Sequence, residues 1–377
     1  MRVCFVSHEA SLGGAERALL ELLLAFRSKG TESSVVLPRK GPLLEELKRL
    51  GIPCVVTRYY YWMGARTVLW KRLGAILVSA VGAIPVMLWV LKWKADLVCT
   101  NSIVVFAGAL AAWTCRKPHV WFIHEFVDES YGFVPYLPFS LTMRLVDISS
   151  SLILTASKTI RQGYARYLPQ SKMHTIHQAA LPPTSLNYQN TSFEHGSGFN
   201  CVSLGALYPG KGHSDAVRAI GNLSKRGLLV YLTIIGGRGP DQVSLQALVR
   251  AEGVQERVFF AGFLPNPLSV MSSADAVLVC SRNEGFGRVA VEAMRLGKPV
   301  VAASSGATLE LIEDGFNGLL YPPGDHEQLA EKLLMLLKSP RLRSELGEKG
   351  RHSVERFSLE TYGAEAARCF NQVLRHD

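Results

Sequence analysis

Two glutamates, Glu284 and Glu292, lie in the part of the sequence that is richest in groups able to bind a substrate. The chain around them follows an apolar run of strand length, turns through Gly285 and Gly287, and enters a helical pattern at Arg288. Backbone amides at such an entry into a helix bind phosphate groups, and an arginine there can add its charge. Glu292 falls about one turn into the helix, where a carboxylate can accept hydrogen bonds from two vicinal hydroxyls such as those of a ribose.

Apolar residues surround these two carboxylates. Phe286, Val289 and Met294 argue against the alternative, in which both glutamates are solvated on a surface. The segment therefore predicts a site for phosphate groups and a ribose, with Glu284 projecting from the loop. The residues expected to bind are Gly285, Phe286, Gly287, Arg288, Val289 and Glu292.

A second loop, rich in glycine and proline, carries Lys211 between a strand-like run and a helical pattern. It begins at Gly205 and reads Gly-Ala-Leu-Tyr-Pro-Gly-Lys-Gly. A flexible ammonium group at this position suits the neutralisation of a diphosphate leaving group. A lysine that is simply solvated is the alternative.

Two shorter motifs stand in the first half of the chain. Gly13 and Gly14 follow the first apolar run and precede a helical pattern, so backbone amides can approach an anion there. A tight strand-to-helix turn is the alternative, and the absence of a G-x-G-x-x-G pattern disfavours a nicotinamide dehydrogenase. His124 follows another apolar run, which places an imidazole at the expected carboxyl edge of a sheet, although a lone histidine is more often structural.

Strand-length apolar runs alternate with helical patterns along most of the chain, which is typical of βαβ units and parallel sheets. Two such series predict the α/β class, with two doubly wound, Rossmann-like domains facing across a cleft. Ligands bind outside the carboxyl ends of parallel strands, which is where the loops above are expected. The runs are residues 2–6, 34–37, 96–100, 119–123 and 151–155, then 199–204, 230–235, 258–260, 276–280 and 299–302. The predicted divisions are a domain over residues 1–180, a polar linker over 181–198, a domain over 199–353 and a terminal segment over 354–377.

Composition limits the class of protein. With 48% hydrophobic and 19% charged residues over 377 positions, the chain is long enough for two well-buried cores. Its seven cysteines are scattered singly, as in reduced proteins of the cytosol, and the apolar N-terminal run is too short for a signal peptide. The formal charge of +10 favours polyanionic partners. Nucleic acid is disfavoured because the basic residues flank apolar segments rather than form a stripe with stacking aromatics.

Residues 74–91 carry no charge, and Trp70, Lys71, Arg72, Lys92, Trp93 and Lys94 flank them. The length is just sufficient for a membrane span, but Gly74, Gly82 and Pro85 interrupt it and the first domain needs a helix here. We expect a helix that lies in the interface of an anionic membrane or is partly buried in the domain. A helix buried in the core and a true span are the alternatives.

Taken together, these motifs resemble the large family 4 of retaining glycosyltransferases, also described as glycosyl transferases group 1. The resemblance spans nearly the whole chain. It rests on GGAE near the start, HE at His124, the loop with Lys211, and EGFGRVAVEAMRLGKPVVAA with its two glutamates, followed by Glu310, Asn317-Gly318 and Pro322. The order and spacing of these motifs are more specific than any one of them.

The resemblance implies the GT-B architecture, an acceptor-binding first domain and a last helix that crosses back onto that domain. Glu292 would hold the ribose of a UDP- or GDP-sugar, Lys211 and the amides at Arg288 and Val289 its diphosphate, and Gly14 would approach from the other domain. Glu284 would contact the transferred sugar, and His124 would support it near the reacting carbon. No metal is implied. Apart from the resemblance, the apolar and basic first domain leads us to expect a glycan or lipid-linked acceptor in cell-surface polysaccharide or glycolipid synthesis, at the inner face of the membrane.

One position departs from the family pattern. Ala206 stands where the family usually has arginine, so Arg282 or Arg288 would have to supply the second cation at the diphosphate. A sugar-nucleotide-binding partner without activity is therefore one alternative. An epimerase or a phosphorylase on the same scaffold is another, because the fold alone does not exclude it.

Overall fold

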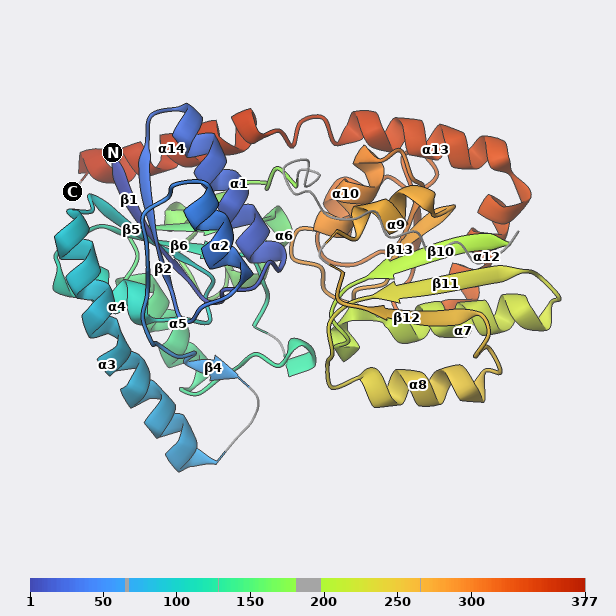
Figure 1. Ribbon diagram of the computed structural model, residues 1–377, viewed down its shortest axis with the longest axis horizontal. Helices are drawn as coiled ribbons and strands as arrows, with labels where there is room; N and C mark the ends of the chain where they lie inside the picture. The colour runs from blue at the N-terminus through green and yellow to red at the C-terminus, as the bar shows by residue number, and fades with distance from the viewer. Residues whose placement is uncertain (65–67, 128, 181–197, 265, 377) are drawn as a thin grey trace. The chain divides into compact units, whose positions relative to one another are not determined.

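The structure is a computed structural model that describes residues 1–64, 68–127, 129–180, 198–264 and 266–376. The chain forms two compact units (Figure 1). Unit 1 comprises Met1–Ala180 together with Phe357–Asp377, and unit 2 comprises Leu181–Arg356. Residues 181–197 of the predicted linker lie outside the described residues.

Unit 1 is built on a parallel sheet with strand order β3-β2-β1-β5-β6-β8-β9. Chain order reverses between β1 and β5, which pair in register with Cys4 opposite Val98. This is the switch point where loops diverge and open a ligand site. The strands are β1 Arg2–Ser7, β2 Glu32–Leu37, β3 Cys54–Val56, β5 Leu97–Asn101, β6 His119–Ile123, β8 Leu152–Thr155 and β9 Met173–Thr175, while β4 Met63–Gly64 pairs antiparallel with β7 Val134–Pro135.

Helices cover this sheet, and the end of the chain is one of them (Figure 1). Phe370 of α14 packs against Phe5 and Phe26, with ring centroids 6.3 and 5.7 Å apart. Gly363 lets α14 approach α1, because an added Cβ would lie 2.5 Å from Cβ of Ala25. The helices are α1 Gly14–Ser28, α2 Pro42–Arg49, α3 Leu69–Trp93, α4 Ala107–Thr114, α5 Phe139–Ile148, α6 Lys158–Tyr164 and α14 Leu359–His376, with 3₁₀ turns η1 Glu129–Tyr131 and η2 Gln170–Lys172.

Unit 2, like unit 1, is built on a parallel sheet, with strand order β12-β11-β10-β13-β14-β15. Its switch point lies between β10 and β13, which pair with Cys201 opposite Ala276. The two loops predicted to bind a ligand, those with Lys211 and Glu284, follow these two strands. The strands are β10 Phe199–Leu204, β11 Val230–Ile235, β12 Val258–Gly262, β13 Ala276–Val279, β14 Val300–Ala303 and β15 Leu319–Tyr321.

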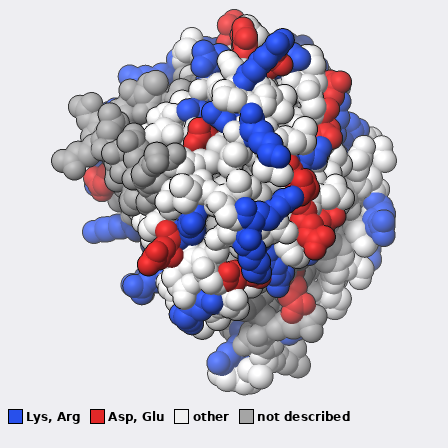
Figure 2. Space-filling model, turned by 90° about the vertical axis from the view of Figure 1, so that its right-hand side faces the viewer, with Lys and Arg blue, Asp and Glu red and all other residues white. Residues whose placement is uncertain are grey.

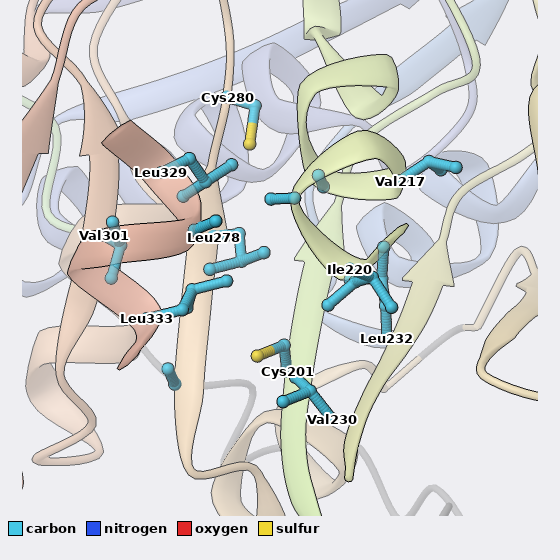
Figure 3. Packing of buried hydrophobic residues seen from close by; sticks show 14 of the residues in the cluster. Cys201, Val217, Ile220, Val230, Leu232, Leu278, Cys280, Val301, Leu329 and Leu333 are labelled. Carbon is cyan, nitrogen blue, oxygen red and sulfur yellow. The ribbon is translucent and has the colours of Figure 1, made fainter. Parts of the chain in front are cut away.

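The core of unit 2 lies between the sheet and helices that carry apolar residues at helical spacing. Figure 3 shows Leu329 and Leu333 of α12 and Ile220 of α7 directed at strand residues such as Leu278 and Leu232. Burying these side chains fixes the frame from which the loops project. The helices are α7 His213–Lys225, α8 Gln242–Ala251, α9 Leu268–Ser273, α10 Arg288–Arg295, α11 Thr308–Leu311, α12 His326–Lys338 and α13 Pro340–Ser353, with η3 Pro209–Lys211.

The predicted fold class and all ten predicted strands are confirmed. Short strands at the edges of the sheets and in the small hairpin were not predicted. These are β3, β4, β7 and β15, of two or three residues each. Such runs are too short for a period of two to be recognised.

Candidate active site

The two predicted loops of unit 2 meet through an ion pair. Nζ of Lys211 lies 3.1 Å from Oε2 of Glu284, and both side chains are largely buried. Burial would raise the pKa of Glu284, but the charge and hydrogen bond of Lys211, with hydrogen bonds from Ser281 and the amide of Gly287, hold it below its ordinary value. The site therefore contains a carboxylate and an ammonium group side by side.

Close backbone contacts hold these loops in place. The amide of Ala307 donates to the carbonyl of Glu284 at 2.8 Å, and that of Arg282 donates to the carbonyl of Gly210 at the same distance. A Cβ on Gly212 would lie 2.0 Å from the carbonyl oxygen of Cys280. Glycine is thus required where the Lys211 loop crosses the loop after β13.

Helix α10 begins directly after this loop and points its amino end into the site. Gly287, with φ of 90°, precedes the helix in the left-handed conformation that favours glycine. The first-turn amides of a helix, here those of Arg288 and Val289, have no partner within the helix itself and suit an anion. Phe286 is buried beneath this turn.

Glu292 lies on the inner side of α10 and is 4% exposed. Its Oε1 is 3.4 Å from Nη2 of Arg288, whose guanidinium group is also buried. Arg288 therefore orients Glu292, in addition to contributing its amide. Arg282 differs, since 51% of its side chain is exposed and its Nη2 lies 3.7 Å from Oδ1 of Asp215.

The Lys211 loop has a further support that the sequence analysis did not assign. His213 is buried at the start of α7, between Oγ of Ser203 at 3.0 Å and the carbonyl of Gly205 at 3.1 Å. Burial lowers its pKa to about 4, so the ring is neutral. Gly205 is itself tightly enclosed, because an added Cβ would lie 3.2 Å from Cδ of Lys211. The signal in the sequence was the histidine two residues after Lys211.

Unit 1 brings its predicted residues together at the switch point beside β1. Helix α1 begins at Gly14 after Gly13, and a Cβ on Gly13 would lie 2.7 Å from Oε2 of Glu16. Glu16 is 2% exposed and pairs with His8, whose Nδ1 lies 3.2 Å from Oε1. The glycine turn is thus fitted closely around a buried carboxylate.

His124 is held at both ring nitrogens. Its Nε2 donates to Oδ1 of Asn101 at 2.8 Å, while its Nδ1 accepts from Nε2 of Gln178 at 2.9 Å. The orientation of Asn101 is set because its Nδ2 donates to the carbonyl of Ala15 at 3.1 Å, which leaves Oδ1 for the histidine. An amide oxygen only accepts and an amide nitrogen only donates, so the ring is neutral with its proton on Nε2.

The residue after His124 carries a carboxyl group that is partly buried. Oε1 of Glu125 accepts a short hydrogen bond from Oγ of Ser102 and another from the amide of Ile103 at 3.2 Å. Burial raises the pKa of Glu125 despite these bonds and the nearby His8. Glu125 ties the loops after β5 and β6 together at the carboxyl edge of the sheet.

Comparison with known families agrees with this geometry. The model of the family "Glycosyltransferase Family 4" matches residues 12–179, and that of "Glycosyl transferases group 1" matches residues 191–353. The chain belongs to the group 1 glycosyltransferases. The first model thus matches residues of unit 1, and the second matches residues of unit 2.

The curated relatives of this glycosyltransferase have names that describe different reactions and pathways. It is 32% identical over 145 residues to an N-acetyl-alpha-D-glucosaminyl L-malate synthase of Bacillus anthracis, covering 38% of each chain. It is 30% identical over 221 residues to the O-antigen biosynthesis glycosyltransferase WclY of Escherichia coli, covering 56% of this chain and 61% of that one. The matched stretches thus span less than two thirds of these relatives.

Solved structures show the same fold over the whole glycosyltransferase chain. The structure of Anabaena HepE with UDP and glucose has a TM-score of 0.81 at 22% identity, covering 99% of this chain and 100% of that one. Sucrose-phosphate synthase of Thermosynechococcus elongatus has a TM-score of 0.76 at 18% identity, with 100% of both chains covered. The fold is therefore GT-B, with two Rossmann-like domains.

The structure divides the predicted site residues of this glycosyltransferase into two groups. Unit 1 gathers Gly13, Gly14 and His124 at the carboxyl edge of its sheet, and unit 2 gathers the remainder around Lys211 and α10. That the two groups meet on one ligand stays a prediction.

Proposed function

We propose that the protein transfers a hexosyl unit from a nucleoside diphosphate sugar, a UDP- or GDP-sugar, to a glycan or lipid-linked acceptor, with retention of anomeric configuration. The observation that carries the proposal is the grouping in unit 2 of an ammonium–carboxylate pair, a helix amino end and a buried glutamate. A diphosphate, a ribose and a sugar are the three chemical groups that these elements suit. The fold shared with HepE, whose structure contains UDP and glucose, supports this choice.

Each part of the donor has a proposed partner. The diphosphate binds at the amides of Arg288 and Val289 and at Lys211, where a positive charge and a helix end act together. Glu292 accepts hydrogen bonds from the ribose hydroxyls. Glu284 accepts from hydroxyls of the transferred sugar, and its carboxylate state suits that role.

Two residues complete the proposed donor site. The exposed guanidinium of Arg282 is the better substitute for the family arginine that Ala206 replaces, because Arg288 is directed at Glu292. Gly14 presents the amino end of α1 from unit 1. Lys211 and the helix ends supply the positive charge that a metal supplies in other transferases, so we propose a reaction without metal.

The proposed reaction is a front-face displacement. The acceptor oxygen attacks the anomeric carbon, the bond to the diphosphate oxygen breaks, and that departing oxygen takes the acceptor's proton. The protein stabilises the growing negative charge on the diphosphate and needs no nucleophile of its own. Because both ring nitrogens of His124 are engaged in unit 1, its proposed role is to position the sugar rather than to move a proton.

Helix α3 supports a peripheral contact with a membrane. Residues 70, 73, 77, 81, 84, 88 and 91 recur at helical spacing and are exposed large apolar side chains. The helix has no acidic residue, while Lys71, Arg72, Lys92 and Lys94 lie at its two ends. This stripe of apolar residues between cations is complementary to an anionic bilayer surface.

The opposite face of α3 is fixed to unit 1. Oγ of Ser79 donates to the carbonyl of Tyr60 at 2.9 Å, and Nε1 of Trp89 donates to Oγ of Ser34 at 3.3 Å. Residues 70–93 are long and apolar enough to cross a membrane, with 28% of the most apolar window buried. Crossing would break these contacts, so we propose that α3 lies in the plane of the inner leaflet, on the cytoplasmic side.

One face of the molecule has mixed charge. Figure 2 shows one face on which Lys and Arg side chains are interspersed with Asp and Glu. Such a pattern differs from the basic stripe of a nucleic-acid surface. We therefore propose small molecules with phosphate groups and anionic lipids, rather than nucleic acid, as the anionic partners.

A donor screen tests the proposal directly. The protein is incubated with uridine, guanosine and adenosine diphosphate sugars, and thermal shift and slow donor hydrolysis are measured. We expect one diphosphate sugar to stabilise the chain and to be hydrolysed to a sugar of unchanged anomeric configuration, observed by NMR before mutarotation. Stabilisation without turnover of any donor, in the presence of membrane lipid extract and glycan acceptors, would instead identify a non-catalytic binding partner.

A further inference from the structure

A pocket of about 500 Å³ lies in unit 1, outside the groups assigned to the donor. It is formed by the segments that follow β1, β2 and β3, so it opens beyond the carboxyl ends of three neighbouring strands. Helix α3 contributes Ala75 to its wall, and four tyrosines contribute their rings. Its position follows the rule for ligand sites in open parallel sheets.

The pocket borders the residues that face the transferred sugar. His8 lines it, and Nδ1 of that ring is 3.2 Å from Oε1 of Glu16 and 3.2 Å from the carbonyl oxygen of Asn101. Glu16 closes the glycine turn, and the side chain of Asn101 orients His124. A molecule in the pocket would therefore lie next to the part of unit 1 that approaches the donor.

One cation of the pocket is available for an anion. Arg39 is held by Glu9, with two hydrogen bonds of 2.7 and 2.6 Å. Burial would raise the pKa of Glu9, but the bonds from Arg39 and from the amide of Ala10 lower it, so the pair is ionised and its charges balance. Arg58 is exposed and forms no ion pair within the part of the chain that the structure describes.

The segment that lines the pocket packs on α3, on the face opposite its exposed apolar stripe. A Cβ on Gly82 would lie 2.7 Å from the carbonyl oxygen of Arg58, and Ser79 bonds the carbonyl of Tyr60, so this segment is packed on the helix. Tyr60 is half-exposed, as an aromatic ring at the level of lipid head groups is expected to be. A ligand that reaches from the outer face of α3 into the pocket needs an apolar tail and an anionic head.

We propose that this pocket binds the acceptor, and that the acceptor is a lipid phosphate or diphosphate whose phosphate group is bound by Arg58. The proposal rests on the proposed transferase function and names the class of its acceptor. The apolar chain of the lipid stays in the bilayer beside α3. The hydroxyl that receives the sugar lies toward His8 and the glycine turn.

Lipid binding by the full chain tests this assignment without a known acceptor. Phosphatidylcholine vesicles containing farnesyl phosphate, or the uncharged farnesol, are floated with the protein. We expect farnesyl phosphate to increase binding relative to farnesol, and Arg58→Gln to reduce that increase about ten-fold, as the loss of one charged hydrogen bond predicts. The matched control Arg49→Gln removes an exposed arginine of α2 that does not line the pocket, and is expected to leave the increase unchanged.

Three results would overturn the proposal. One is equal binding of farnesyl phosphate by wild type and Arg58→Gln, with thermal melts showing that both are folded. Another is displacement by an equal concentration of inorganic phosphate, which identifies a site for free phosphate. The third is an equal loss of binding by Arg58→Gln on phosphatidylglycerol vesicles that contain no farnesyl phosphate. That result would identify a general attraction of Arg58 to anionic lipid.

Donor hydrolysis separates failure of this proposal from failure of the proposed function. We expect Arg58→Gln to hydrolyse the donor as fast as wild type, because Arg58 lies outside the donor groups. If no form of the protein hydrolyses or transfers a sugar while the farnesyl phosphate result holds, the lipid site stands and the transferase proposal fails. If hydrolysis is normal and the lipid result fails, only the acceptor assignment is wrong.

Discussion

Units 1 and 2 have the same kind of doubly wound sheet but different chemistry at the switch point. Unit 2 places two ion pairs there, Lys211 with Glu284 and Arg288 with Glu292. Unit 1 places His124 there as a neutral ring held by two side-chain amides. The charged groups of unit 2 suit a diphosphate, and the neutral ring of His124 suits a sugar.

This difference arises in the loops, because the strands of both units are similar buried apolar runs. A parallel sheet determines where loops meet but not which groups they carry. We therefore predict that unit 2 supplies most of the charge that stabilises the leaving group, and that His124 of unit 1 orients the sugar. Substitutions that remove one group at a time can contradict that division.

The largest effect is expected for Lys211→Met. The variant removes the flexible cation from the diphosphate and leaves Glu284 without its partner. Loss of one preorganised group that stabilises transition-state charge costs about 10²- to 10³-fold in kcat. Steady-state kinetics with the donor found by the screen measures it.

Lys225→Met is the matched control, because Lys225 also pairs with a glutamate of unit 2 but is exposed, at 2.8 Å from Oε2 of Glu252. We expect the control to keep wild-type turnover. A fall of less than five-fold for Lys211→Met would contradict a charge-stabilising role for unit 2.

The next effect is expected for Glu292→Gln. An amide accepts fewer hydrogen bonds from a ribose and leaves the buried Arg288 without its counter-charge. We expect the Kd for the nucleoside diphosphate to rise about 30-fold, corresponding to about 2 kcal/mol. Isothermal titration measures it, with Glu331→Gln, an exposed glutamate paired with Arg226, as control.

Each unit also contains one buried neutral histidine, and these make stability depend on pH. Burial lowers the pKa of His213 in unit 2 to about 4 and that of His119 in unit 1 to about 3. The unfolded chain takes up these protons near pH 6.5, so stability is complete above that pH and is lost as the pH falls toward the folded pKa values. At pH 5 we expect the free energy of unfolding of each unit to be about 2 kcal/mol lower than at neutral pH.

Urea unfolding at pH 7.5 and pH 5 measures this loss. His213→Gln removes the titrating group from unit 2 and should reduce the pH dependence of that unit only. His119→Gln should do the same for unit 1. Equal pH dependence in wild type and both variants would show that the two rings are not the source of the acid sensitivity.

A smaller effect is expected for His124→Ala. The substitution removes a ring that positions the sugar, so kcat should fall about ten-fold while the Kd for the nucleoside diphosphate changes less than two-fold. Because the ring is neutral and both nitrogens are bonded, the pH profile of kcat should keep its shape. A profile that loses an ionisation near pH 6.5 would assign proton transfer to His124. His352→Ala, an exposed histidine of unit 2, is the control.

The sequence was sufficient to predict the longer strands and the glycine turn before α10. The runs at 120–123 and 276–280 are apolar throughout, which marks strands covered on both faces, and both lie in strands of the two parallel sheets. The residues around Gly287 predicted that it lies where a loop enters a helix. In the structure Gly287 lies directly before α10. These are local patterns, so they need no knowledge of tertiary contacts.

The partners of the site residues could not be predicted in this way. Gln178 binds His124 from 54 positions away, and Lys211 meets Glu284 from 73 positions away. Arg288 was expected to be available to the phosphate, and its ion pair with Glu292, one turn further along the same helix, was not predicted. Contacts of this kind depend on how the loops fold. The spacing of apolar residues in a single sequence predicts helices and strands, but it does not predict which distant loops meet.

The smallest effect is expected at the membrane, where the comparison between units is sharpest. The exposed apolar stripe of α3 belongs to unit 1, so vesicle binding should depend on that unit alone. Lys92→Gln should weaken binding to phosphatidylglycerol vesicles about five-fold, since one basic residue near an anionic surface contributes about 1 kcal/mol. The matched change Lys338→Gln, in the last turn of α12 in unit 2, should have no effect.

The apolar part of the contact is separable from the charged part. Leu77, 66% exposed on α3, and Val243, 74% exposed on α8, are both surface aliphatic residues. Leu77→Ser should weaken vesicle binding at every salt concentration, whereas the loss in Lys92→Gln should disappear at high salt because charges are screened there. Equal loss from Leu77→Ser and Val243→Ser would show that the chain binds lipid without using α3, and the assignment of unit 1 to the membrane would fail.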